Sequence, residues 1–432
     1  MSRQVQAPCG VFELNCAYQN YAWGKVGSSS EVAKLLKSGN ASVSIEEQTP
    51  YAELWMGTHP SAPSTIPMAD GQSLADWVQG NPDGLGKPVR ERFGGALPFL
   101  FKVLSVQKSL SIQAHPSKAH AEELHKRDPT NYRDPNHKPE MAIALTNFTG
   151  LCGFRPIQEI VAFVDNISQL QTVIGADKTA GLMSAGSSDN PDVVREAIAE
   201  AFGALMRQNK DILDREFPGD VGGFSVFFLN VIHLKKGEAI FLEANLPHAY
   251  LSGDCMECMA CSDNVVRAGL TPKFIDTETL LQMLNYTGKP AEDNKYQPSV
   301  FKENGVTIRR FTPPIADFSV TEILVDAAQT SFNLQTMDSA SIIICIAGSG
   351  TLNGGIKKYS DVVVVGVGRM VGDGGVVCSD DVVGAGDVGV VIAGDVVGVV
   401  IAGDMGGVIS VGSAGDMVGA GGVVGAGGIV WT

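Results

Sequence analysis

Apolar residues occur in short runs or alternate with polar ones through most of the first 150 residues. The run from Pro98 to Leu104 is apolar enough for a buried strand, and Gly and Pro interrupt the chain at short intervals. One helix is indicated from Ser117 to Lys126, with Ser117 as its N-cap. We therefore predict a region of many short strands and turns before residue 155.

Between residues 155 and 222 the apolar period changes from that of a strand to that of a helix. Apolar side chains recur at helical spacing from Ile157 to Ile167 and again from Val194 to Leu205. Asn190 is a good N-cap, and Pro191 suits the first helical turn. This segment is predicted to be an inserted helical domain.

Strand patterns return at residue 223, where Gly237 predicts a turn before the apolar stretch from Ala239 to Leu242. A second β-region begins near Val300 and runs through Ser341 to Ile346. Many short strands with turn signals are typical of a sandwich or a barrel.

Residues 358–432 are dominated by Gly, Val, Asp and Ala. Arg369 is the only basic residue after Lys358, and Trp431 is the only aromatic residue after Tyr359. Few large side chains are present to fill a core. A calcium-binding Gly-Asp repeat is an alternative, but the spacing is irregular. We expect a low-complexity tail without a packed core.

The composition narrows the classes of function. The chain has 432 residues, 44% of them apolar, which predicts a globular protein of two or three domains. A net charge of −15 disfavours nucleic acid as a partner. Eight cysteines are too sparse for a disulfide scaffold, and neither a signal-like run from Met1 to Val11 nor a membrane span is visible. We expect a cytoplasmic protein with no membrane partner.

The first candidate site residues lie in the segment from Ser109 to Pro116. In a strand, Ser111, Gln113 and His115 would share one face, and apolar residues would occupy the other. Such a polar row suggests the lining of a cavity. The alternative is a solvated edge strand with an ordinary surface histidine.

Two more segments offer metal ligands. His248 follows an apolar strand, and Glu140 stands at the start of another strand, after the sequence Asn136-His-Lys-Pro. Two imidazoles, an amide and a carboxylate suit zinc, and also Fe²⁺, Mn²⁺ or Co²⁺. The alternative for each is a hydrogen-bonded histidine or an exposed loop charge.

The cysteines of Cys255-x-x-Cys258-x-x-Cys261 are spaced as in zinc or iron–sulfur sites, but a fourth ligand at a fixed distance is missing. In a strand, Cys255 and Cys261 would face away from Cys258. Buried structural thiols are therefore expected.

Several longer motifs stand in a fixed order along the chain, at 19–24, 52–60, 111–116, 137–140, 247–250 and 257–274. Together, and in this order, they resemble type I mannose-6-phosphate isomerases (phosphomannose isomerases), zinc enzymes of the cupin superfamily. The resemblance covers roughly residues 10–355.

The resemblance implies a mainly β fold. A cupin (jelly-roll) catalytic domain would comprise residues 1–154 and 223–299, with the helical domain 155–222 inserted. A partial cupin-like domain would follow at 300–357. This second barrel is expected to be incomplete, because the strand pattern stops near Gly354 and the tail 358–432 follows.

The resemblance also implies roles for individual residues, carried over by their motifs. One Zn²⁺ per chain would be held by Gln113, His115, Glu140 and His248. Catalytic positions match Arg267, Glu257 and Lys138. Substrate and phosphate contacts match Ser111, Lys102, Lys273, Trp23, Tyr250 and Asp263.

The implied reaction interconverts mannose 6-phosphate and fructose 6-phosphate through a cis-enediol, feeds GDP-mannose synthesis, and takes place in a monomer. Arg267 would supply a fixed positive charge, and Glu257 would be the base, with Lys138 or a metal-bound water as rivals. A cupin oxygenase using Fe²⁺ and a non-catalytic sugar-binding cupin are the alternatives. Convergence of Arg267, Lys273 and Lys102 on the metal cavity would favour the isomerase.

Overall fold

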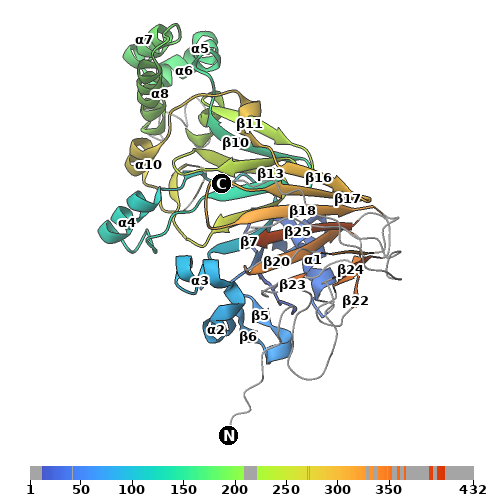
Figure 1. The fold of residues 1–432 in the computed structure, drawn as a ribbon. Coiled ribbons are helices and arrows are strands. Elements are labelled where there is room, and N and C mark those ends of the chain that lie inside the picture. Colours follow the sequence, from blue (N-terminus) through green and yellow to red (C-terminus); the bar gives the residue numbers. More distant parts are fainter. Residues whose placement is uncertain are drawn as a thin grey trace, which may run out of the picture.

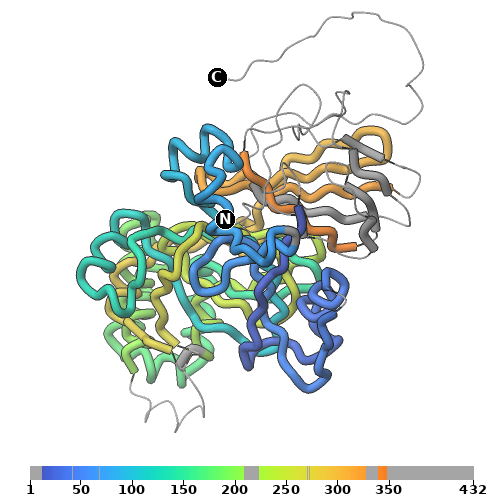
Figure 2. The backbone as a smooth tube through the Cα atoms, turned by 90° about the horizontal axis from the view of Figure 1, so that it is seen from below, coloured from blue at the N-terminus to red at the C-terminus, as the bar shows by residue number. Residues whose placement is uncertain are grey.

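The computed structural model describes residues 12–40, 42–208, 221–269, 271, 273–326, 331–333, 339–347, 349–352, 358–360, 364–365, 389–392 and 397–403. Figure 1 shows a large β-sheet system with a group of helices at one end. Figure 2 shows the orange C-terminal strands on the side away from those helices. The helices are α5 (Ile157–Asn166), α6 (Ser168–Ile174), α7 (Ala176–Ala185) and α8 (Pro191–Met206).

The helical insertion is present where the periodicity predicts it. Asn190 caps α8 by accepting a hydrogen bond from the backbone N–H of Asp192, and Pro191 is the first helical residue. Apolar side chains of these helices pack with those of the neighbouring strands in one buried cluster. The insertion is therefore attached to the sheet through a shared core. No described helix is long and apolar enough to cross a membrane.

The larger sheet has eleven strands among the described residues. Seven follow one another in space: β1 (Ala17–Gln19), β4 (Glu53–Met56), β7 (Phe99–Val106), β13 (His248–Ala260), β9 (Glu140–Ala144), β12 (Ala239–Leu242) and β15 (Lys295–Tyr296). Four more join through β13 and its neighbours: β8 (Ile112–Ala114), β10 (Phe148–Phe154), β11 (Leu229–Leu234) and β14 (Val266–Gly269).

Strand β13 belongs to both parts of this sheet. Its first residues pair with β10 and β8, and residues 253–260 pair with β7 and β9. The change of partners occurs at Gly253, whose φ is +111°. A Cβ there would lie 2.5 Å from the carbonyl oxygen of Asn147, so only glycine fits. This strand brings His248 and Glu257 into one cavity.

A second sheet follows in the chain. Its order is β16 (Ser299–Glu303), β17 (Val306–Phe311), β18 (Ser319–Val325), β25 (Val397–Gly403), β20 (Ser341–Ala347) and β23 (Val364–Val365). Its apolar side chains Phe311 and Phe318 share a buried cluster with Met141 and Cys258 of the larger sheet. The two sheets are thus joined by packing, directly behind β9 and β13.

The tail contributes backbone pairing to both C-terminal sheets. Strand β25 lies between β18 and β20, antiparallel to both. A four-stranded sheet adds β19 (Ser331–Asn333), β24 (Gly389–Ile392), β21 (Ser349–Leu352) and β22 (Lys358–Ser360). The packing of the tail's side chains lies outside the described residues, so the lack of a core stays a prediction.

The mainly β fold class is wrong, because helices and strands occupy similar shares of the described chain. The helix after Ser117 is confirmed as α4 (Lys118–Arg127), and Ser117 caps it. Three helices before residue 155 were missed: α1 (Glu31–Gly39), α2 (Leu74–Gly80) and α3 (Lys87–Phe93). They are short and lie between Gly- and Pro-rich turns, and these turn signals outweighed their helical spacing in the prediction.

Candidate active site

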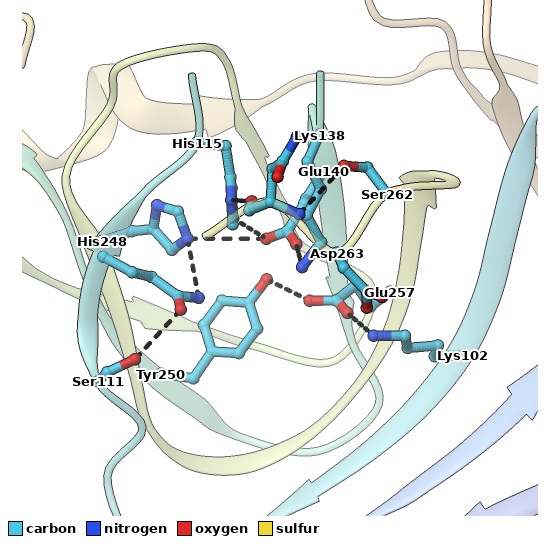
Figure 3. Close-up of polar contacts among 12 residues, drawn as sticks. Lys102, Ser111, His115, Lys138, Glu140, His248, Tyr250, Glu257, Ser262 and Asp263 are labelled. Carbon is cyan, nitrogen blue, oxygen red and sulfur yellow. Dashed lines mark hydrogen bonds and ion pairs between the residues drawn. The ribbon is translucent and has the colours of Figure 1, made fainter. Parts of the chain in front are cut away.

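A cavity of about 510 Å³ opens among strands β4, β7, β8, β9, β13 and β14. Every site residue predicted from the sequence lines it, apart from two histidines. These two, His115 and His248, have no exposed surface and lie just behind its wall. Figure 3 shows the side chains pointing toward one another from the surrounding strands.

Strand register explains this convergence. Gln113 on β8 lies opposite His248 on β13 and also opposite Arg267 on β14. Glu257 on β13 lies opposite Lys102 on β7. Side chains directly opposite one another in a sheet share a face. Residues separated by more than 130 positions are thereby brought to one cavity.

Three of the four predicted ligands form a compact buried group. Ligand atoms of His115, Glu140 and His248 all lie within 4.8 Å of one another. Oε2 of Glu140 is 3.3 Å from Nε2 of His115 and 3.6 Å from Nε2 of His248. Gln113 adjoins the group, because its Nε2 is 3.3 Å from Nε2 of His248. The structure therefore brings all four residues together, and Figure 3 shows His115, Glu140 and His248 side by side.

Backbone carbonyls orient both imidazoles. Nδ1 of His115 is 2.8 Å from the carbonyl oxygen of Asn264, and Nδ1 of His248 is 2.9 Å from that of Leu246. A carbonyl only accepts, so each Nδ1 carries the proton and each Nε2 presents a lone pair to the site. Burial lowers the pKa of His248 to about 4, which keeps the ring neutral at physiological pH.

These donors fit a divalent cation. Nε2 of His115 and Oε2 of Glu140 are buried and make no hydrogen bond, although burying an unpaired polar atom is unfavourable. Two neutral imidazoles and a carboxylate suit zinc and its neighbours in the first transition series. Gln113 donates from its amide nitrogen to His248 and accepts from Ser111 Oγ at 3.2 Å, so its oxygen would have to turn inward to bind metal.

A second network surrounds Glu257. Tyr250 donates its hydroxyl to Oε1 of Glu257 at 2.9 Å, and Nζ of Lys102 lies 3.3 Å from Oε2. Burial, then the charge of Glu140, raises the pKa of Glu257 to about 7, against the opposing effect of Lys102. A carboxyl group with such a pKa can both accept and return a proton near neutral pH.

Lysines 102 and 138 already have anionic partners. Nζ of Lys102 also lies 3.5 Å from Glu53, and Nζ of Lys138 lies 3.1 Å from Oε1 of Glu140. Burial alone would lower the pKa of Lys102, but Glu53 and Glu257 together outweigh it and keep the pKa above its ordinary value. The expected phosphate contact of Lys102 stays a prediction, since its charge is compensated within the protein.

Arg267 and Lys273 differ from those lysines. Both line the cavity, and in the described part of the chain neither forms an ion pair with a carboxylate. Nζ of Lys273 lies 5.3 Å from the ring centroid of Tyr21. Partial burial lowers the pKa of both cations, and only Arg267 is half-buried, whereas the side chain of Lys273 is exposed at the mouth of the cavity. These two side chains suit an anionic group on a ligand.

Sequence reasoning missed Glu53, Trp55 and His59, which also line the cavity. Nε2 of His59 lies 3.3 Å from Oδ1 of Asp263, and Nδ1 accepts from the backbone N–H of Ser61 at 3.2 Å. Glu53 and Trp55 alternate on β4 as the polar row of β8 does. That alternation was the available signal; no comparable signal marks His59.

The cysteines do not form a metal site in the described residues, where the only candidate group is His115, Glu140 and His248. Cys255 and Cys258 are buried in different apolar clusters on opposite faces of β13. Burial raises the pKa of both thiols. They are structural thiols, as expected.

Comparison with known proteins gives consistent similarities. Residues 11–157 match the family model "Phosphomannose isomerase type I, catalytic domain", and residues 311–355 match "Phosphomannose isomerase type I C-terminal". Mannose-6-phosphate isomerases of Mus musculus and Homo sapiens are 46% and 45% identical, over 79% and 78% of this chain and 88% of each relative.

Comparison with solved structures points to the same family. The crystal structure of a phosphomannose isomerase variant from Salmonella typhimurium superposes with a TM-score of 0.70 at 29% identity, covering 92% of this chain and 99% of that one. A zinc-bound mannose 6-phosphate isomerase gives 0.68 at 31% identity, covering 91% and 99%.

Proposed function

The chain belongs to the type I phosphomannose isomerase family and is an isomerase, and we propose that its cavity interconverts mannose 6-phosphate and fructose 6-phosphate with one bound zinc ion. The observation that carries the proposal is the joint presence of a buried metal-ligand group and two cations that have no anionic partner among the described residues. The first suits a Lewis acid, and the second suits a phosphate.

His115, Glu140, His248 and Gln113 are the proposed ligands. The buried, unbonded atoms of His115 and Glu140 support this assignment, and a relative is known with zinc bound. When bound, the ion would add positive charge beside the oxygen on which negative charge develops. Gln113 lies on β8, His115 directly follows β8, and Glu140 and His248 are the first residues of β9 and β13. Rigid strands hold such groups in place.

Glu257 is the proposed base. The reaction moves a proton from carbon 2 to carbon 1 of the open-chain sugar through a cis-enediol. Glu257 would take the proton as a carboxylate and return it as an acid, which its pKa of about 7 supports. Tyr250 and Lys102 hold its two oxygens in place. Lys138, beside Glu140, is the rival for this role.

Arg267 and Lys273 are proposed to receive the negatively charged groups of the substrate. Arg267 lies opposite Gln113 in the β14–β8 ladder, so its charge is close to the metal site and would stabilise the enediolate. Lys273, with Ser111, Tyr21 and Trp23, forms the part of the cavity proposed for the phosphate. An oxygenase or a storage protein gives no reason for two such cations beside the metal.

The remaining family features belong to the same proposal. They are a jelly-roll architecture, the domain division at residues 154, 223 and 300, a monomeric state, a cytoplasmic location and a supply of mannose units to GDP-mannose. The sharing of β13 between two antiparallel arrays supports the jelly-roll.

Isomerisation in D₂O tests the mechanism. Fructose 6-phosphate formed from mannose 6-phosphate should acquire deuterium at carbon 1, because a base that holds the proton exchanges it with solvent. Mass spectrometry of the product measures this. Turnover without any deuterium would contradict a base that exchanges its proton with solvent, and no turnover in zinc-loaded protein would contradict the function.

A further inference from the structure

The segment between α4 and β9 connects the site to two different parts of the protein. It carries Lys138 and ends at Glu140. Asp134 accepts hydrogen bonds from the hydroxyl of Ser262 at 2.8 Å and from the backbone N–H of Asp263 at 2.7 Å. One side of the segment is thus attached to the cavity wall.

The other side contacts the C-terminal sheet. Nε2 of His137 lies 3.1 Å and 3.2 Å from the two carboxylate oxygens of Asp317. Asp317 is 6% exposed and lies two residues before β18. This is a direct polar contact between the C-terminal sheet and the residue next to Lys138.

Apolar packing reinforces the same junction. Met141, directly after Glu140, packs in one cluster with Phe311 and Phe318 of the C-terminal sheet. Because side chains alternate along β9, Glu140 faces the metal site while Met141 faces that sheet. A shift of the C-terminal sheet would therefore displace Glu140 and Lys138 together.

We propose that Asp317 is a positioning residue, which fixes the segment bearing Lys138 and Glu140 through its contact with His137. The C-terminal sheet then takes part in setting the geometry of the metal site, although none of its described side chains lines the cavity. The turnover part of the test rests on the proposed isomerisation, and the metal-release part rests only on the proposed metal site.

A second polar contact between the sheets provides a control. Arg309 on β17 forms an ion pair with Glu322 and donates to the backbone carbonyl of Gly237, at the turn before β12. Glu322 is buried like Asp317 but is connected to that turn, not to the segment before β9. Loss of Glu322 loosens the sheet junction without touching His137.

The test compares Asp317→Asn with Glu322→Gln in the full zinc-loaded chain. Asp317→Asn should lower kcat on the order of tenfold, with a change in KM for mannose 6-phosphate below about twofold. It should also release zinc to a chromogenic chelator on the order of tenfold faster. Glu322→Gln should lower the melting temperature but leave kcat and zinc release within about twofold of the parent.

A double-mutant cycle tests whether Asp317 acts through His137. The pair His137→Gln and Asp317→Asn should be no worse than the more severe single variant. The proposal is overturned if the two effects add, if Asp317→Asn leaves zinc release unchanged, or if Glu322→Gln causes equal losses. If Asp317→Asn does not fold, Asp317→Glu is measured in its place and judged by the same criteria. If the parent does not isomerise mannose 6-phosphate, the proposed function fails while zinc release still decides this inference.

Discussion

Glu257 and Lys102 lie directly opposite each other in the β13–β7 ladder, and their side chains form an ion pair of 3.3 Å inside the cavity. Trp55 occupies the next position in the same row, with its ring centroid 4.8 Å from Nζ of Lys102. The lysine is therefore placed to control the proton affinity of Glu257 rather than to move freely toward a substrate.

This pair predicts a pH dependence. A base must be deprotonated, so kcat should rise as the pH increases through about 7, the pKa of Glu257. A metal ion beside Glu140 would offset one cause of the raised pKa, so the rise in the loaded enzyme should lie at or below pH 7. Lys102→Met removes the charge that lowers this pKa and should move the rise upward, on the order of one pH unit.

The pH–rate profiles of the parent and of Lys102→Met measure this shift. Lys34→Met, which replaces an exposed lysine on α1, is the control and should retain the parent profile. A profile of Lys102→Met that coincides with the parent's would exclude Glu257 as the titrating base.

Metal removal should abolish activity and lower stability. Dialysis against a chelator leaves His115 and Glu140 with buried, unpaired atoms, and zinc should restore turnover. Zinc at a hundred times its Kd should raise the free energy of unfolding by about 2.7 kcal/mol. Calorimetry with and without zinc measures this difference. Glu140→Gln should lose most of this stabilisation by zinc, whereas Glu122→Gln, at an exposed position on α4, should keep it. Restoration by Fe²⁺ alone, with oxygen consumption, would support an oxygenase.

Arg267→Ala should lower kcat by roughly a hundredfold or more, because a fixed charge near the developing enediolate is lost. Its zinc content should be unchanged, since Arg267 is not among the grouped ligands. Metal analysis and steady-state kinetics measure both. Arg195→Ala, which replaces an exposed arginine on α8, is the control for loss of an arginine. Near-normal turnover would remove Arg267 from the mechanism.

The polar row that lines the candidate site was readable from the sequence because its signal is local. Alternation placed Ser111 and Gln113 on one face of β8, and Ile112 and Ala114 are indeed buried in the apolar cluster behind it. The pairing of β8 with β13 and β14 was not readable, since ladder register depends on packing between distant segments. The resemblance, rather than the pattern, joined Gln113 to His248 and Arg267.

His59 was predicted neither from the residue pattern nor from the family resemblance. Its position within the motif 52–60 carries no chemical pattern, and its role follows only from the contact with Asp263. The hydrogen bond from His59 is the largest cause of the lowered pKa of Asp263. Likewise, α1 was missed although Val32, Leu35 and Leu36 have helical spacing, because the whole region before residue 150 was interpreted as short strands and turns.

His59→Phe should therefore raise the pKa of Asp263 and lower kcat/KM on the order of tenfold, about the effect of one hydrogen bond to a charged group. His59→Gln retains an N–H donor and should recover part of the loss. Both variants should bind zinc normally, which metal analysis checks. Equal kinetics for His59→Phe and the parent would show that Asp263 needs no support from His59.

Limited proteolysis tests the C-terminal tail. Strand β25 has a neighbour on each side, with Val399 opposite Ile323 and Ile401 opposite Ile343, so backbone pairing favours protection. The composition argues the other way: Gly weakens strands by roughly 0.5–1 kcal/mol per residue, and Asp recurs with Arg369 as the only basic residue after Lys358. We expect the composition to prevail, because too few large side chains are present to bury.

A broad-specificity protease should trim the chain to near residue 358 well before it cuts the larger sheet. The remaining fragment should still bind zinc, since the four proposed ligands lie between residues 113 and 248. Mass spectrometry of the fragment gives the boundary. A tail that resists as long as the catalytic sheet would show that β25 is a packed inner strand and that the C-terminal domain extends to it.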